Sequence, residues 1–209
     1  AEADFKGSNV SDLQVDVTAS GKIWLKGDSI NPVDIKPFNA TFKSTALKES
    51  GEFSLLNVPF SVLSLFFSAP SSLTGMFGFT GSYNYKKKSP GVIAELVLTD
   101  AKVSEKEILL KRGKVFLTSS FLEVDISIKE STAVESVDIS GQLPLSSTLP
   151  FDIKLESHGD GLSFLDGFSD DLFTWKSGTS DLRLLIRGTL DEPVANGYFV
   201  VNKGEFLFN

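Results

Sequence analysis

The sequence of 209 residues contains no cysteine, one histidine and one methionine. Without cysteine the chain can form no disulfide, use no thiol nucleophile and bind no metal through sulfur. A chain without free thiols also suits an oxidising envelope compartment, where a stray thiol is a liability. Twenty basic residues against twenty-seven acidic ones give a net charge of −7, so an interface with nucleic-acid phosphates is not expected.

Motifs of catalysis and cofactor binding are also missing. The sequence has no Gly-x-Ser-x-Gly elbow, no P-loop, no dinucleotide-binding glycine motif and no metalloprotease helix. Its one imidazole, His158, lies in a Gly- and Asp-containing segment that is typical of a surface turn. Four aspartates between positions 160 and 171 have a spacing that fits no calcium loop. We therefore expect no enzymatic activity, no cofactor and no metal site.

Long apolar runs and targeting signals are absent as well. No segment approaches the roughly 18 apolar residues of a membrane-spanning helix, and the first residues are acidic and polar. The last residues, 204–209, end inside a predicted strand. We expect residues 1–209 to be a single segment of a longer protein.

What the sequence has in abundance is alternation of apolar and polar residues. Eighteen phenylalanines and many serines and valines are typical of pleated, half-buried surfaces. In 122–129, for example, Leu, Val, Ile and Ile alternate with Glu, Asp, Ser and Lys. Turn signals recur at intervals that are typical of an antiparallel meander, and we count about twelve strands. Two segments, 59–67 and 162–172, have apolar residues three and four apart, which predicts one or two helical turns in each.

The alternation predicts one apolar face along the whole sheet. Such a face must be covered by a second sheet, by the same sheet folded over, or by a ligand, and the residue pattern leaves these alternatives open. A bulge near Pro37 or Ser119–Ser120 could shift the alternation by one residue, so that residues of the apolar face and the polar face change sides. If a ligand covers the face, acyl chains gain about 0.8 kcal/mol per buried methylene. The candidate groove residues are Val15, Val17, Phe42, Leu96, Val124, Ile126, Ile139, Ile153, Leu184 and Ile186.

The carboxy-terminal part of the chain resembles the TamB family. Residues 180–193 form a strand that ends in Gly-Thr-Leu, two acidic residues and Pro, and 197–206 form a strand that closes on Gly-Glu-Phe. Three further segments look like the family's strands and short helical insert, namely 141–145, 56–63 with 73–75, and 94–101. The resemblance covers roughly residues 10–209, and its motifs are built from common strand and turn residues.

The resemblance implies an all-β fold, the β-taco: a long antiparallel sheet folded over as a half-pipe with a hydrophobic inner face. It also implies a non-enzymatic protein that bridges the periplasm, or the equivalent chloroplast intermembrane space. Phospholipid acyl chains, a BamA/TamA-type outer-membrane insertase and an inner-membrane anchor outside this segment are the implied partners. The function implied is phospholipid transport and outer-membrane biogenesis, including protein translocation and membrane protein assembly.

Two other functions remain open at this stage. In the first, the chain guides outer-membrane proteins to the insertase by adding their strands to its sheet edge. In the second, it is a structural or adhesive β-sandwich with a closed core.

Overall fold

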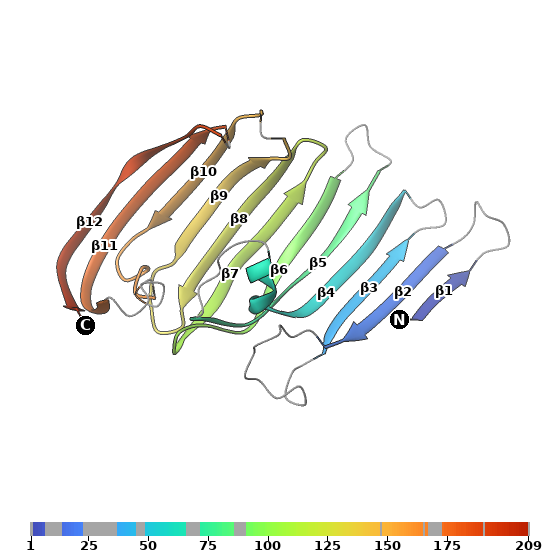
Figure 1. Cartoon of the computed structure of the whole chain (residues 1–209), viewed down its shortest axis with the longest axis horizontal. Coiled ribbons are helices and arrows are strands. Elements are labelled where there is room, and N and C mark those ends of the chain that lie inside the picture. The colour runs from blue at the N-terminus through green and yellow to red at the C-terminus, as the bar shows by residue number, and fades with distance from the viewer. Residues whose placement is uncertain are drawn as a thin grey trace.

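The computed structural model describes residues 2–6, 14–22, 37–44, 49–65, 72–85, 91–146, 148–164, 166, 173–189 and 191–208. In this part of the chain twelve strands form one antiparallel sheet whose two edges, β1 and β12, lie far apart (Figure 1). The predicted all-β antiparallel fold is confirmed. The strands are β1 (Glu2–Lys6), β2 (Gln14–Gly21), β3 (Phe38–Ser44), β4 (Ser50–Pro59), β5 (Leu73–Asn84), β6 (Gly91–Val103), β7 (Lys106–Leu117), β8 (Phe121–Glu130), β9 (Val137–Pro144), β10 (Phe151–Ser157), β11 (Phe173–Gly188) and β12 (Pro193–Phe208).

The sheet is a simple meander. Strand order in the sheet equals strand order in the chain, because each strand pairs antiparallel with its neighbours in sequence. The described strands therefore make one sheet, with no second sheet packed against it among them. A β-sandwich needs two packed sheets, so this topology disfavours that alternative.

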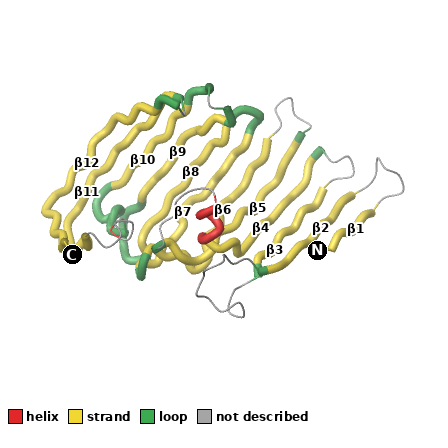
Figure 2. Tube along the Cα trace, in the orientation of Figure 1, coloured by secondary structure: helices red, strands yellow, loops and turns green. Residues whose placement is uncertain are grey.

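A short helix lies between β4 and β5. The 3-10 helix η2 (Phe60–Leu65) follows β4 and lies within the segment 59–67, where a helical turn is predicted (Figure 2). In the second such segment, residues 162–164 form turns, while 165 and 167–172 lie outside the described residues. None of the described helices is long and apolar enough to cross a membrane.

Bulges keep apolar side chains on one face. Between β4 and β5 the register shifts after Leu55, where Asn57 has a φ of 60°. With strict alternation, Val58 would point to the side opposite Leu55. The extra residue at the bulge reverses this, so Val58 lies on the same face as Leu55. Val58 pairs with Phe77 and is only 5% exposed. The shift therefore serves burial of Val58.

Candidate functional site

The strand register gathers the predicted groove residues on one face of the sheet. Residues directly opposite each other on paired strands project to the same side of the sheet. A row of residues on one face can therefore be traced from strand to strand through these pairs. One row of paired residues runs without a break from β1 to β12: Ala3, Val17, Phe42, Phe53, Gly81, Ala94, Val115, Val124, Gly141, Ile153, Ile186 and Ala195. No residue of this row is polar, and five of its members are predicted groove residues.

A second apolar row lies beside the first. It runs over Ala19, Ala40, Leu55, Phe79 and Leu96, and then over Gly113, Ile126, Ile139, Leu155, Leu184 and Gly197. A Cβ on Gly113 would lie 2.8 Å from the Cβ of Leu96, so the two parts of the row meet there. Four more predicted residues lie in this row, and Val15 lies two residues before Val17 on β2, on the same side. We call the side that carries both rows the apolar face.

The opposite side, the polar face, has a different composition. One row there consists of Thr18, Thr41, Ser54, Thr80, Glu95, Lys114, Asp125, Ser140, Lys154, Leu185 and Asn196. Arg112 bridges Asp125 (2.7 Å) and Asp138 (3.5 Å), and Arg187 pairs with Asp152 at 2.9 Å. Polar and charged side chains of this kind belong in water, whereas both apolar rows favour contact with other apolar groups.

One end of the apolar face is covered by the chain itself. Residues 158–164, which we call the capping loop, follow β10 and place Leu162 and Phe164 over the sheet, where they are 2% and 3% exposed. They form a core cluster with Ala101, Val103, Ile108 and Val137. At the same end, Phe60 of η2 packs on Phe77 with ring centroids 5.5 Å apart. Of the ten predicted groove residues only Ile139 packs against this cluster.

Polar contacts hold the capping loop to its neighbours. The carboxylate of Asp160 accepts hydrogen bonds from the backbone N–H groups of Val134 (2.9 Å) and Glu135 (2.9 Å). Burial raises the pKa of Asp160, but these donors outweigh it, and the pKa lies below its ordinary value. Just beyond the loop, Asp166 is 7% exposed and forms an ion pair with Lys106 at 2.8 Å. These aspartates anchor the loop.

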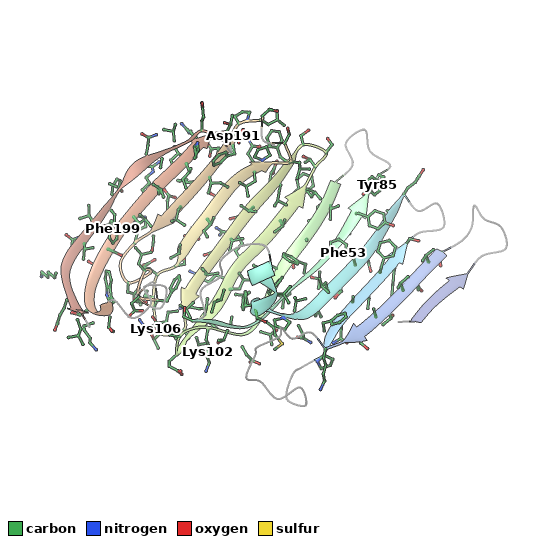
Figure 3. The ribbon with its side chains drawn as sticks, in the orientation of Figure 1. Phe53, Tyr85, Lys102, Lys106, Asp191 and Phe199 are labelled. Carbon is green, nitrogen blue, oxygen red and sulfur yellow. The ribbon has the colours of Figure 1, made fainter. Side chains whose placement is uncertain are left out.

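At the other end of the apolar face, the described residues provide no cover. Phe42 and Tyr85 are 38% and 57% exposed there, and no described helix or second sheet covers them. Together with Phe53, Tyr83 and Val92 they line a hollow of about 310 Å³. Two of these side chains, Phe53 and Tyr85, are labelled in Figure 3. The rings of Phe42 and Tyr83 stack at 5.6 Å with an interplanar angle of 4°. Burial, with a smaller contribution from Tyr85, raises the pKa of Tyr83 above its ordinary value, so the Tyr83 hydroxyl stays neutral near pH 7.

This aromatic hollow was not predicted from the sequence. Phe53 belongs to β4, Tyr83 belongs to β5 and Tyr85 directly follows β5. Only the register brings these residues beside Phe42 of β3. The available signal was the alternation of Tyr83, Asn84 and Tyr85, which places both tyrosines on one side of an extended chain. The capping loop was also missed, although Leu162 and Phe164 are apolar residues among turn formers.

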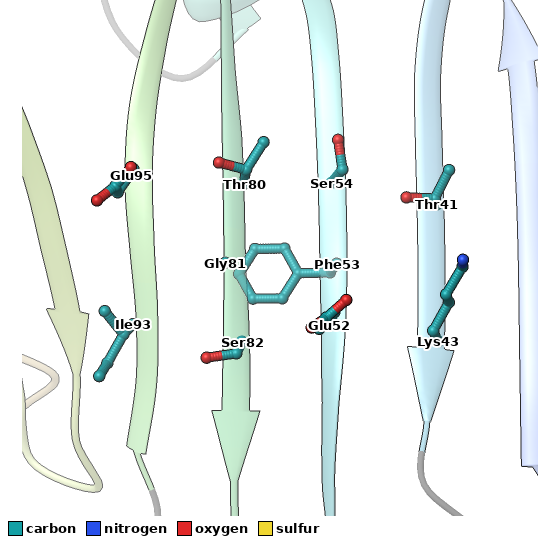
Figure 4. Close-up of a pocket in the computed structure, with 10 residues that line it drawn as sticks. All are labelled: Thr41, Lys43, Glu52, Phe53, Ser54, Thr80, Gly81, Ser82, Ile93 and Glu95. Carbon is teal, nitrogen blue, oxygen red and sulfur yellow. The ribbon is translucent and has the colours of Figure 1, made fainter.

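A larger hollow lies on the polar face. It measures about 540 Å³ and extends across β3 to β6 (Figure 4). Hydroxyl groups and charges dominate its lining: Thr41, Lys43, Glu52, Ser54, Thr80, Ser82 and Glu95. Its side chains come from the solvated face of the sheet, and the described residues contain no group of three acidic or histidine side chains that could hold a metal ion. We therefore assign the candidate site to the apolar face.

The one histidine lies outside the apolar face. His158 Nδ1 is 2.8 Å from Oδ1 of Asp181, and its side chain is 65% exposed. The hydrogen bond to Asp181 raises the pKa of His158. This pair joins the start of the capping loop to β11.

Comparison with known proteins gives no identification. No family model, no curated protein and no solved structure matches this chain. The class that fold and site define is an open antiparallel meander with one apolar face that is covered at one end.

Proposed function

We propose that the chain is a TamB-like segment whose apolar face carries phospholipid acyl chains between two membranes of an envelope. The supporting observation is the unbroken apolar row across all twelve described strands. A continuous row without polar interruption offers an acyl chain similar contacts at every strand. Lipid could then slide along the face without a deep local minimum.

The face is suited to acyl chains rather than to headgroups. The aromatic hollow on this face is lined by Phe, Tyr and Val, and its lining among the described residues includes no charged side chain. A buried headgroup charge would need a partner, whereas a hydrocarbon chain needs none. Folding of the sheet into a half-pipe, as the TamB resemblance implies, would enclose the chains further.

The partners and location that we propose follow from the same resemblance. They are an outer-membrane insertase of the BamA/TamA type, an inner-membrane anchor outside this segment, and the periplasm or the chloroplast intermembrane space. In this setting the chain supports outer-membrane biogenesis without catalysing a reaction.

The experiment is native mass spectrometry with lipid extraction on purified protein. The test variant carries Ile126→Asp and Leu184→Asp, both in the second apolar row. The control variant carries Ile93→Asp and Leu185→Asp, the same changes on the polar face, where Ile93 is 56% exposed. A carboxylate in the apolar row must stay hydrated, so acyl chains lose contact there.

We expect phospholipid to co-purify with the wild type and the control variant and to be lost from the test variant, with unchanged circular dichroism in all three. A wild type without lipid, even after incubation with phosphatidylcholine or phosphatidylglycerol vesicles, would contradict the proposal. Equal lipid loss from the control variant would assign the binding to another surface.

A further inference from the structure

A third row of residues on the apolar face contains polar side chains, which the first two rows lack. By the register it runs over Ser44, Gly51, Tyr83, Val92, Leu117, Leu122 and Leu143. Two of these residues, Ser44 and Tyr83, have a hydroxyl group. The Ser44 hydroxyl accepts a hydrogen bond from the backbone N–H of Val15 at 3.2 Å. The described part of the chain supplies no hydrogen-bond partner for the Tyr83 hydroxyl.

The Tyr83 ring has a defined place on the sheet. It stacks on Phe42 with an interplanar angle of 4°. It also lies over Gly51, where a Cβ would be 2.8 Å from the Tyr83 hydroxyl oxygen, so glycine at position 51 leaves room for the ring. The ring of Tyr85 lies beside it, with ring centroids 5.4 Å apart. These contacts place the Tyr83 hydroxyl at the aromatic hollow, between the apolar rows and Tyr85.

The chemistry of this hydroxyl defines what kind of ligand group it can bind. A tyrosine hydroxyl donates one hydrogen bond. Because burial raises the pKa of Tyr83, the hydroxyl keeps its proton near pH 7 and stays a donor. A donor without a partner on an apolar surface favours a ligand that offers an acceptor at that point and hydrocarbon beside it. A carbonyl oxygen at the end of an acyl chain meets both conditions.

We propose that Tyr83 donates a hydrogen bond to an ester carbonyl of a bound lipid whose acyl chains lie on the neighbouring apolar rows. The inference rests on the proposed function and adds a polar subsite to it. An ester accepts hydrogen bonds but cannot donate them, so it complements a single donor. One such hydrogen bond contributes little to affinity, and it therefore orients the lipid without preventing its movement along the face.

The surroundings of Tyr83 suit the junction between the headgroup and the chains of a phospholipid. Phe42, Phe53 and Val92 offer apolar contacts to the first methylenes of the chains. Tyr85 is 57% exposed and borders water, where a charged headgroup stays hydrated. Tyrosine is common where apolar and polar surroundings meet. Because the lining of the hollow among the described residues includes no charged side chain, the subsite recognises the ester and not the headgroup.

The test compares an ester lipid with its ether analogue. Dihexanoyl phosphatidylcholine contains ester carbonyls, whereas its di-O-hexyl analogue has the same headgroup and chain length without them. Calorimetric titration below the micelle concentrations gives the dissociation constants for the wild type, for Tyr83→Phe, which removes only the hydroxyl, and for Tyr198→Phe, the same change on the polar face. We expect Tyr83→Phe to raise the dissociation constant of the ester lipid about three- to tenfold and that of the ether lipid less than about twofold. Tyr198→Phe should change neither.

The two lipids also separate this inference from the proposed function. If Tyr83→Phe binds the ester lipid like the wild type, or weakens both lipids alike as a folding defect would, the hydrogen bond is overturned while acyl-chain binding stands. A wild type that binds neither lipid would overturn both.

Infrared spectroscopy of the bound ester lipid gives a second measurement on the wild type itself. The ester carbonyl stretch should lie at lower frequency on the wild type than on Tyr83→Phe, because a hydrogen bond weakens the carbonyl bond. The same frequency on both proteins would contradict the proposal.

Discussion

Single residues contribute differently on the two faces of the sheet. On the polar face, ion pairs such as that of Arg112 with Asp125 join neighbouring strands, but both side chains are 45% exposed. Exposed pairs of this kind contribute little to stability because water and salt screen them. On the apolar face, Phe53 extends over Gly81, where a Cβ would lie 2.8 Å from the ring. Burial of such side chains, more than ion pairing, stabilises this sheet.

His158 provides a measurable residue-scale property. Its hydrogen bond to Asp181 raises its folded-state pKa above the ordinary value of 6.5. Because the folded pKa exceeds the unfolded one, the pair stabilises the fold fully below about pH 6.5, and this contribution is lost as the pH rises through the folded pKa.

We predict that a proton NMR titration of this single imidazole has its midpoint above 6.5 in the wild type. The Asp181→Asn variant, which removes the charged acceptor, should move the midpoint down towards the ordinary value. A wild-type midpoint at or below 6.5, or a variant that titrates like the wild type, would show that this contact is absent in solution.

At the scale of elements, the capping loop decides which part of the apolar face is covered. Leu162 and Phe164 bury the ends of β6, β7 and β9 at one end of the sheet, as their neighbours Val103, Ile108 and Val137 show. Lys106, at the start of β7, is paired with Asp166 and also donates to the carbonyl of Ser163. The loop is therefore part of the core.

We predict that Phe164→Ala lowers the free energy of unfolding by about 3 to 4 kcal/mol, because it leaves a cavity under a side chain that is 3% exposed. Urea unfolding followed by circular dichroism measures this value. Leu145→Ala, at a side chain that is 57% exposed, is the control and should change it by less than about 0.5 kcal/mol. Equal effects of the two substitutions would mean that the loop is not packed on the sheet.

The sequence predicted the elements better than their details. Alternation revealed the strands and the side on which each apolar residue lies, so all ten predicted groove residues lie on one face. Bulges leave no comparable signal: the shift at Asn57 depends on the burial of Val58 against Phe77, a residue of another strand. Residues 119 and 120, where a bulge was considered, form the turn between β7 and β8 instead. Contacts between distant segments, such as Phe164 on Val103, also require the fold.

At the scale of the whole molecule, the central feature is an open sheet with unequal faces. Both apolar rows extend from one edge region to the other, while in the described part of the chain the capping loop and η2 cover only one end. An uncovered apolar face of this size is rare in a monomeric protein in water. Acyl chains bound along this face are the cover that we propose for it.

The most direct test of the central claim is methyl NMR of the deuterated chain with protonated isoleucine methyl groups and dihexanoyl phosphatidylcholine below its micelle concentration. Intermolecular NOEs, which need near contact, should join lipid acyl protons to Ile126, Ile153 and Ile186 on the apolar face. Ile93 on the polar face, 56% exposed, should show none, and neither should Ile108 under the capping loop, 6% exposed. NOEs of equal strength to Ile93, or none to the three apolar-face isoleucines, would contradict an acyl-chain-binding face.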